Sequence, residues 1–545
     1  TDGGTNWERR SGQGTAPNLM HWFEGNTPTG GQGTYDLAIL VDPNDKDRIY
    51  TGGVNIWGSE DGGINWNGVS YWTGAYGVSL HADQHFFAHN ELDDRFYICN
   101  DGGLYRTDSI QMGDWDDIFD PGYQWPTQWE NLSDGMQTTS FYRLGVSLSQ
   151  ADNVIAGAQD NSTFYRYNGT WSNIIGGDGM ECLIDPTDAS RIYGTFQFGA
   201  MARSNNAGQW FEYGITDQIR FGTDERGAWT TPYFMDESAP LTLYAAYGNA
   251  WKTEDGGDTW SRLSDCPSMT GAGFPAPASM IVQAPSDDNV LYMSKRIYHQ
   301  FNQPSELWRS IDGGFSWTNL SLSVSLPDSL FFNDLSIDDD DPFHLWLSLG
   351  GFVDGVKVFE SFDAGDSWQN ASGSLPNLPV NTILHQPGSP NNIVYAGLDI
   401  GVWYKSDTSD WQMYSQNLPN VIVTELEINP TNEKLYAATF GRGLWQADLV
   451  EDQNNVSIEP GLDEMSVSLS PNPNDGYFHL QISDAPQNSL QMEIVDVKGS
   501  VLRREQLSLS AGTVAREYQL DLPYGLYYLR LSAGNRSYVE KFLIE

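Results

Sequence analysis

The stretch Ser310–Trp317 reads Ser-Ile-Asp-Gly-Gly-Phe-Ser-Trp, and its return along the chain decides the fold class. Complete copies of the same pattern stand at Ser59–Trp66, Thr253–Trp260 and Ser361–Trp368. The residues Thr1–Trp7 are a copy that lacks its first position, so we expect the sequence to begin inside a longer protein.

This pattern, the Asp-box, is typical of a β-hairpin turn. The aspartate accepts backbone N–H groups across the turn, and the following glycine takes a positive φ. The tryptophan begins the next strand, where we expect it to pack between neighbouring sheets. The residues to which we assign these structural roles are Asp61, Gly63, Trp66, Asp255, Gly257, Trp260, Asp312, Gly314, Trp317, Asp363, Gly365 and Trp368.

The spacing of the boxes indicates one propeller blade per repeat. Trp260 and Trp317 are 317 − 260 = 57 positions apart, and an acidic or Asn-Pro turn followed by an apolar strand precedes the boxes. Strands such as Ile393–Ala396 are rich in β-branched and aromatic residues. Repeats of about this length with four short strands predict an all-β chain built as an Asp-box β-propeller.

The number of blades follows from where the repeat is interrupted. The strand pattern occurs nine times, but the box is lost over residues 108–128 and seven copies follow. We therefore favour a seven-bladed propeller over residues 125–450, with residues 1–124 as terminal blades of an upstream propeller. The segment Gln128–Leu132 would supply the missing strand of the last blade. The alternative is one ring of nine, closed by Thr1–Arg10.

The tail changes in character. Residues 451–462 are polar and read as a linker, whereas residues 463–545 contain short alternating strands such as Tyr477–Ile482 and Leu526–Leu531. This pattern predicts a small Ig-like β-sandwich.

Composition excludes some functions. Lys plus Arg is 28 and Asp plus Glu is 72, which gives a net charge of −44, so nucleic acid and anionic lipid are excluded as partners. Three cysteines allow one disulfide at most, and no apolar run is long enough to span a bilayer. We expect no cofactor, although the many carboxylates leave calcium as an option.

The boxes resemble those of sialidases, sortilin-type propellers and bacterial xyloglucanases. Four longer stretches resemble a recurrent type of secreted Bacteroidetes propeller: Gly157–Asn161, Gly176–Pro186, Leu375–Ile383 and Phe440–Trp445. The Asp-box is specific for a hairpin and carries no chemistry of its own.

The tail resembles the type A C-terminal sorting domain of the type IX secretion system. The matching residues are Pro471, Asn472, Pro473, Gly476, Asp496, Gly499, Gly525, Tyr527 and Lys541. The resemblance implies export to the outer face of the outer membrane and contact of residues 463–545 with an outer-membrane shuttle or the translocon. It also implies that the tail is removed when the passenger is attached to the surface. We expect recognition by strand addition near Lys541–Glu545.

Three groups are candidates for chemistry. His81, Asp83 and His85 would share one face of a strand and could bind a metal, although a structural cluster is the favoured interpretation. Asp338–Asp341 reads as a turn between strands in preference to a calcium loop. Trp115, Tyr123 and Trp125 could form a ligand platform for a sugar or could pack the insertion.

Two functions remain open. The favoured hypothesis is a surface protein, without enzymatic activity, that binds glycan, protein or matrix. The alternative is a secreted glycoside hydrolase, which would need two facing carboxylates that the sequence does not pair. A sialidase is disfavoured, because no arginine cluster is evident.

Overall fold

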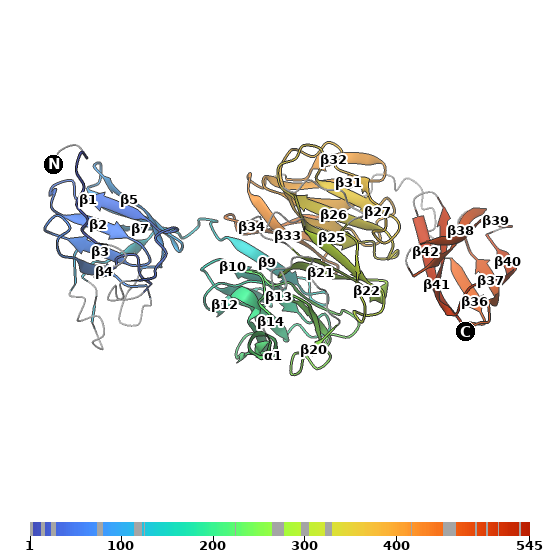
Figure 1. The fold of residues 1–545 in the computed structure, drawn as a ribbon. Helices are drawn as coiled ribbons and strands as arrows, with labels where there is room; N and C mark the ends of the chain where they lie inside the picture. The colour runs from blue at the N-terminus through green and yellow to red at the C-terminus, as the bar shows by residue number, and fades with distance from the viewer. Residues whose placement is uncertain are drawn as a thin grey trace. The chain divides into compact units, whose positions relative to one another are not determined.

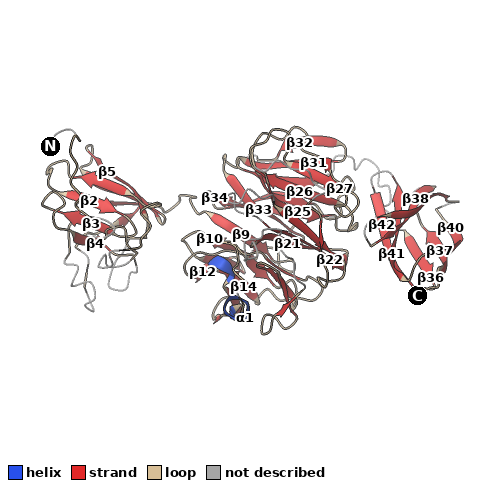
Figure 2. Ribbon diagram, viewed as in Figure 1, coloured by secondary structure: helices blue, strands red, loops and turns tan. Residues whose placement is uncertain are grey.

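A computed structural model describes residues 4–545 except 12–16, 23–28, 73–79, 114–122, 125, 224, 264–276, 296–304, 322–329, 416, 451–464, 486–487, 498–499, 511 and 534–535. These residues belong to two compact units, Thr1–Thr138 and Thr139–Glu545. Strands account for almost all of the regular structure, as Figure 2 shows. The all-β class predicted from the sequence is confirmed.

The first unit holds two antiparallel four-stranded sheets (Figure 1). The strands of the first sheet are β1 (Ala38–Val41), β2 (Ile49–Gly52), β3 (Ile56–Ser59) and β4 (Asn67–Ser70). Those of the second are β5 (Gln84–Asn90), β6 (Arg95–Asn100), β7 (Gly103–Thr107) and β8 (Glu130–Asn131). Tyr50, Ile56 and Ile98 lie in the core between them.

The prediction that Gln128–Leu132 completes the last blade is wrong. β8, which lies in this segment, pairs with β7 instead, with Tyr105 opposite Asn131 and Arg106 opposite Glu130. The guanidinium of Arg106 donates to both carboxylate oxygens of Glu130, at 2.6 and 2.9 Å. β8 therefore completes the second sheet of the first unit and not the last sheet of the ring.

The second unit contains a ring of seven sheets. Sheet 1 comprises β9 (Phe141–Val146), β10 (Val154–Ala158), β11 (Thr163–Tyr167) and β12 (Thr170–Ile175). Sheet 2 comprises β13 (Cys182–Ile184), β14 (Ile192–Thr195), β15 (Met201–Ser204) and β16 (Glu212–Tyr213). Sheet 3 comprises β17 (Tyr233–Met235), β18 (Leu243–Ala246), β19 (Ala250–Thr253) and β20 (Ser261–Arg262). Sheet 4 comprises β21 (Ala278–Ala284), β22 (Asp287–Lys295), β23 (Glu306–Ser310) and β24 (Thr318–Asn319). Sheet 5 comprises β25 (Phe331–Ile337), β26 (Leu345–Gly350), β27 (Val358–Ser361) and β28 (Gln369–Asn370).

Sheet 6 comprises β29 (Val380–His385), β30 (Val394–Leu398), β31 (Gly401–Ser406) and β32 (Ser409–Met413). Sheet 7 comprises β33 (Ile422–Asn429), β34 (Lys434–Phe440) and β35 (Leu444–Asp448). A 3₁₀ turn (Gln197–Gly199) and a single short helix, α1 (Asp217–Gly222), interrupt the described part of the ring.

The ring closes between its seventh and first sheets. Arg143 on β9 donates to the carbonyl of Thr424 on β33 at 3.0 Å, and the hydroxyl of Thr424 donates to the carbonyl of Phe141 at 2.9 Å. An isolated bridge joins Ser140 to Phe440. Closure therefore takes place inside the second unit, and the alternative ring of nine sheets does not form.

The four complete boxes share one hydrogen-bond pattern. In the copy at Ser310, the serine hydroxyl donates to Asp312 at 2.8 Å and accepts the N–H of Gly314 at 2.8 Å. Asp312 also accepts the N–H of Ser316 at 2.8 Å. The corresponding glycines Gly63, Gly257, Gly314 and Gly365 have φ between 86° and 104°, the left-handed region that glycine adopts without strain.

The box tryptophans of the ring pack between successive sheets. Trp260 lies in a cluster that joins sheets 2 and 3, and Trp317 packs on one that joins sheets 3 and 4. Trp368 packs on the cluster that joins sheets 4 and 5. In the first unit, Trp66 is half-buried in its own turn.

The C-terminal residues form a two-layer sandwich. One sheet has the order β36 (Ser466–Ser470), β37 (Tyr477–Ser483), β40 (Val514–Gln519). The other has the order β39 (Val501–Ser508), β38 (Ser489–Asp496), β41 (Gly525–Ala533), β42 (Arg536–Ile544). Phe478, Leu529 and Phe542 are fully buried in the core between the two sheets. The predicted linker, residues 451–462, lies outside the described residues.

Candidate functional site

The first strands of all seven sheets line a pocket at the centre of the ring. Its volume is about 330 Å³, and every one of these strands, β9, β13, β17, β21, β25, β29 and β33, lines it directly. We call this cavity the axial pocket. Its polar lining includes five ionisable residues that the strands bring together from distant positions: Arg143, Glu181, Asp334, Glu425 and Glu427.

Arg143 is the cation of this group. Its Nε lies 3.4 Å from Glu181 and 3.8 Å from Glu425. Its Nη1 donates to the carbonyl of Thr424 at 3.0 Å. Asp334 is held separately, since its Oδ2 accepts the hydroxyl of Thr382 at 2.9 Å and the N–H of Ile383 at 3.0 Å. One guanidinium therefore faces several carboxyl groups.

Burial raises the pKa of these carboxyl groups. The pKa of Glu181 rises to about 7 through burial, which the charge of Arg143 opposes. The pKa of Glu427 rises to about 8 through burial and through the charges of Glu181, Glu237 and Asp334. The pKa of Glu425 is also well above its usual range, with burial as the largest cause. Near neutral pH, Glu181 and Glu427 can both donate and accept protons.

A second cavity adjoins the axial pocket and has an aromatic rim. We call it the mouth; its volume is about 500 Å³, and Arg143 and Asn333 line both cavities. Trp229 lines the mouth with 46 % of its surface exposed, and its indole N–H donates to the hydroxyl of Tyr142 at 3.3 Å. Phe198 stands edge-on to Trp229, with 5.3 Å between ring centroids.

Polar side chains face the mouth beside these rings. Asn333 and Asn381 line it, and their amide groups are fixed because Asn333 donates to the carbonyl of Val380 at 2.8 Å and Asn381 donates to Asp399 at 3.0 Å. An aromatic face next to oriented amides can stack on a sugar ring and hydrogen-bond to its hydroxyl groups.

The predicted ligand platform is only partly covered by the structure. Trp115 and Trp125 lie outside the described residues, and Tyr123 is half-buried in the first unit. Asp338–Asp341 occupies the turn between β25 and β26, where Asp338 accepts the N–H groups of Asp340 and Asp341 at 2.9 and 3.2 Å. Cys99 and Cys182 are free thiols, whereas Cys266 lies outside the described residues.

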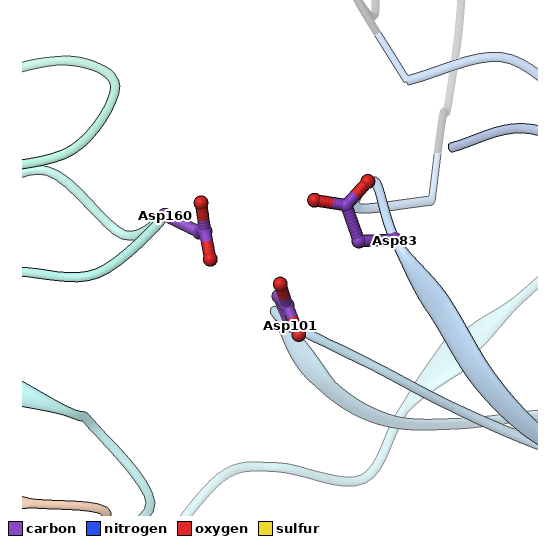
Figure 3. Close-up of side chains that lie close together, drawn as sticks. All are labelled: Asp83, Asp101 and Asp160. Carbon is purple, nitrogen blue, oxygen red and sulfur yellow. The ribbon is translucent and has the colours of Figure 1, made fainter. Parts of the chain in front are cut away.

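The expectation that His81, Asp83 and His85 alternate along one strand is wrong. β5 begins at Gln84, and Asp83 has a φ of 65°, so the backbone turns before the strand starts. His85 reaches Asp101, with its Nε2 2.7 Å from a carboxylate oxygen. Figure 3 shows Asp83 and Asp101 directing their carboxylates toward the same space. Asp160, labelled in the same view, is a residue of the second unit, where its N–H donates to Asp178 at 2.8 Å.

The sequence reasoning missed the axial residues, although a signal for them exists. In four of the repeats, a charged residue stands directly before an apolar residue of the first strand. These residues are Arg143, Glu181, Asp334 and Glu425. Aligning only the first strands would have shown a charged position that faces the ring centre. The box lies between the third and fourth strands of a sheet, so its pattern says nothing about the first strand, which carries the axial residues.

The predicted sorting residues hold the last strand of the sandwich in place. The amide of Asn472 donates to the carbonyl of Lys541 at 3.0 Å and accepts the N–H of Leu543 at 3.0 Å. Gly476 has a φ of 90°, and a Cβ there would lie 2.3 Å from the carbonyl of Leu520. The hydroxyl of Tyr527, in the core, donates to the carbonyl of Pro523 at 2.8 Å.

Three further sorting residues occupy simpler positions. Asp496 accepts the N–H of Ser500 at 2.9 Å, and Gly525 is the first residue of β41. Pro471 and Pro473 flank Asn472 in the exposed segment after β36, whereas Gly499 lies outside the described residues.

The family model of the secretion system C-terminal sorting domain matches residues 468–545. The chain is a type IX secretion cargo. The cargo is therefore secreted or displayed at the cell surface, and its tail interacts with the type IX export machinery. No helix in the described part of this cargo is long and apolar enough to cross a bilayer.

Similar solved structures include three that cover most of one chain or the other. YCF48 from Cyanidioschyzon merolae is 8 % identical, with 58 % of this chain and 97 % of that chain covered and a TM-score of 0.42. The extracellular domain of the putative hybrid two component system BT3049 from B. thetaiotaomicron is 12 % identical, with 93 % and 68 % covered and a TM-score of 0.41. PorZ, a surface component of the type IX secretion system of Porphyromonas gingivalis, is 12 % identical, with 94 % and 86 % covered and a TM-score of 0.28. A search of curated proteins gave no match to this cargo.

Proposed function

We propose that this cargo is a surface protein, without enzymatic activity, that binds a glycan in the mouth of its ring. The observation that carries the proposal is the exposed face of Trp229, which is held at the rim of a cavity of about 500 Å³ by its hydrogen bond to Tyr142. An aromatic side chain that is half-exposed and yet fixed in orientation loses little conformational freedom when a ligand stacks on it.

The neighbouring groups favour a neutral polyhydroxyl ligand. Asn333, Asn381 and Thr230 add amide and hydroxyl groups to the lining. Arg143, a cation that lines the mouth, is already paired with Glu181 and Glu425, so an acidic ligand that approached it would have to displace these partners. A sugar needs no such exchange, because its hydroxyl groups both donate and accept hydrogen bonds.

The test starts with a glycan array probed with the full chain, followed by calorimetry on the ligands that bind. Trp229→Ala should weaken binding at least tenfold, about 1.4 kcal/mol, while Trp229→Phe should retain most of the affinity. The matched control is Trp171→Ala, which removes an equally exposed tryptophan (47 %) from the outer strand β12 and should leave binding unchanged. Equal losses in Trp229→Ala and Trp171→Ala would contradict the proposal.

A glycoside hydrolase is the second candidate, and one observation favours it. Burial raises the pKa of Glu181 to about 7 and of Glu427 to about 8, the range in which a carboxyl group acts as a general acid at neutral pH. Ligands from the array should therefore be incubated with the protein and assayed for new reducing ends. Release of reducing ends that is lost in Glu181→Gln would replace the binding proposal with the hydrolase.

We also propose that the sorting domain is read by an outer-membrane shuttle or the translocon, and that the passenger remains on the outer face of the outer membrane. The support is the sorting domain at residues 468–545. Protease treatment of intact cells should degrade the ring. A ring that is degraded only after the outer membrane is opened would contradict the outer-face location.

A further inference from the structure

The turn that stands beside Trp229 contains a strained residue. Phe198, in the 3₁₀ turn Gln197–Gly199 between β14 and β15, has a φ of 61° and a ψ of 27°. A bulky side chain disfavours this left-handed backbone, which glycine, asparagine and aspartate adopt more readily. Among the described residues other than glycine that have a positive φ, Phe198 is the only aromatic one. Such strain persists only where the surroundings fix it, and it is concentrated at functional sites.

A buried group of hydroxyls fixes this turn. The carbonyl oxygen of Gly199, the residue after Phe198, lies within hydrogen-bond distance of three hydroxyl oxygens. They belong to Thr216 at 2.7 Å, Tyr233 at 2.5 Å and Tyr247 at 2.6 Å. All three residues are buried, so water does not compete for these bonds. The turn is therefore held from its buried side, although the backbone conformation of Phe198 is unfavourable.

Two contacts connect Phe198 directly to Trp229. The backbone N–H of Phe198 donates to the carbonyl of Trp229 at 3.2 Å. The two rings meet edge-on, with 5.3 Å between their centroids and 87° between their planes. The hydrogen bond from the indole to Tyr142 is long, at 3.3 Å, and constrains the indole only weakly. The ring of Phe198 therefore supplies a restraint on the plane of the indole that this hydrogen bond does not.

The segment that carries Trp229 is anchored before it reaches the mouth. Glu225 is buried and accepts the backbone N–H and the side-chain amide of Asn249, both at 2.8 Å. The guanidinium of the next residue, Arg226, lies over the ring of Phe198, 4.0 Å from its centroid. This cation–π contact and the contacts of Trp229 join the segment to the strained turn.

We propose that Phe198 is a positioning residue for the ligand site in the mouth, because its ring fixes the plane of Trp229 before a sugar arrives. This inference rests on the proposed glycan-binding function. Phe198 is not among the described residues that line the mouth, so it acts through Trp229 and not by touching the sugar. An aromatic side chain that is fixed in advance does not have to be ordered on binding. The strained backbone is retained because it directs the ring of Phe198 at Trp229.

The deciding measurement is fluorine NMR of the full chain labelled with fluorotryptophan, without added sugar. The signal of Trp229 is the one that is missing from the spectrum of Trp229→Phe. Phe198→Ala should change the position and width of this signal, because the indole then takes more than one orientation. Phe198→Tyr keeps the ring and should restore the wild-type signal. The matched control is Phe196→Ala, since the ring of Phe196 lies near Tyr213, with 6.3 Å between centroids, and its removal should leave the signal unchanged.

Calorimetry then measures affinity for the neutral oligosaccharide that binds the wild type most tightly on the glycan array. Ordering one side chain corresponds to roughly a threefold to tenfold change in Kd, so Phe198→Ala should weaken binding by that factor and Phe198→Tyr should restore it. Phe198→Gly separates strain from the ring, because glycine accepts the positive φ and lacks the ring. It should melt at a higher temperature than Phe198→Ala and bind no more tightly.

Three results would overturn the proposal. The first is a Trp229 signal that is unchanged in Phe198→Ala, and the second is a signal that changes as much in Phe196→Ala. The third is wild-type affinity in Phe198→Gly, which would show that the ring is dispensable. If Phe198→Ala fails to fold, Phe198→Gly takes its place in the NMR comparison. If no neutral oligosaccharide on the array binds the wild type, the proposed function fails, and the fluorine signal alone decides whether Phe198 fixes Trp229.

Discussion

Replacing Trp260 with alanine tests whether the box tryptophans hold the sheets of the ring together. The side chain is 3 % exposed and lies in the cluster shared by sheets 2 and 3. Its indole N–H donates to the carbonyl of Ile215, just after β16, at 2.9 Å. Removing the indole of Trp260 therefore leaves a cavity between two sheets and an unsatisfied carbonyl at Ile215.

The expected loss in the free energy of unfolding is about 4–5 kcal/mol. A buried tryptophan covers roughly 200 Å² of surface, which at about 25 cal/mol per Å² corresponds to about 5 kcal/mol as an upper bound. Measured truncations of buried tryptophan fall at about 3–5 kcal/mol, and the carbonyl of Ile215 adds about 1 kcal/mol.

Trp317→Ala is the matched control. Trp317 is only half-buried, and its indole N–H donates to Gly314 within its own turn at 3.1 Å. We therefore expect about 2–3 kcal/mol for this variant, below the range for a fully buried ring. Pulse proteolysis of the full chain in urea, scored on the fragment that carries the ring, measures both values. Equal losses, or a loss below about 1 kcal/mol in Trp260→Ala, would refute the reasoning.

Three other predictions follow from the export signal and the titratable groups. Deleting residues 463–545 should leave a folded ring that accumulates in the periplasm; detection of the truncated protein on the surface by cell fractionation would contradict this. Because the pKa of Glu427 rises from 4.5 to about 8 in the folded state, its ionisation destabilises the ring as the pH increases through that window. Glu427→Gln should therefore gain urea resistance relative to the wild type at pH 9 compared with pH 5, and a difference that does not change with pH would show that this glutamate stays ionised. Although burial lowers it, hydrogen bonds to Asp338 and Glu360 raise the pKa of His344 from 6.5 to about 9, so its stabilisation is complete below pH 6.5 and lost as the pH rises through 9. His344→Gln should thus be more destabilising at pH 6 than at pH 10, and the opposite order in urea unfolding would contradict the assignment.

The parts of the fold that were predictable are those set by neighbouring residues. The box at Ser310 forms its turn from bonds that span four residues at most, so its pattern can be read directly in the sequence. The sandwich was predictable for the same reason, since its strands alternate and its turns carry glycine. The sheet to which Glu130 belongs was not predictable, because its strand could pair either with β7 or with the last sheet of the ring. Only the folded structure decides between these two partners.

The candidate sites depend on contacts between residues that lie far apart in the sequence. Arg143 meets the strand of Glu425 across 281 positions, and Phe198 meets Trp229 although β15, β16 and α1 stand between them in the chain. The alternative in which His81, Asp83 and His85 share one face and bind a metal assumed a strand that starts earlier than β5 does. The positive φ of Asp83 breaks that periodicity, and no composition signal marks it.

Ring closure between β9 and β33 has a consequence for the order of synthesis. The two strands are joined by bonds between residues 281 positions apart, so bringing them together costs roughly 5 kcal/mol of chain entropy that only the complete ring recovers. The sorting domain at residues 468–545 follows the closing strand along the chain. A truncated product that ends before β33 therefore lacks both its ring closure and its export address. Only chains whose ring sequence is complete can present themselves for secretion, which gives the cell a length check without a separate inspecting factor.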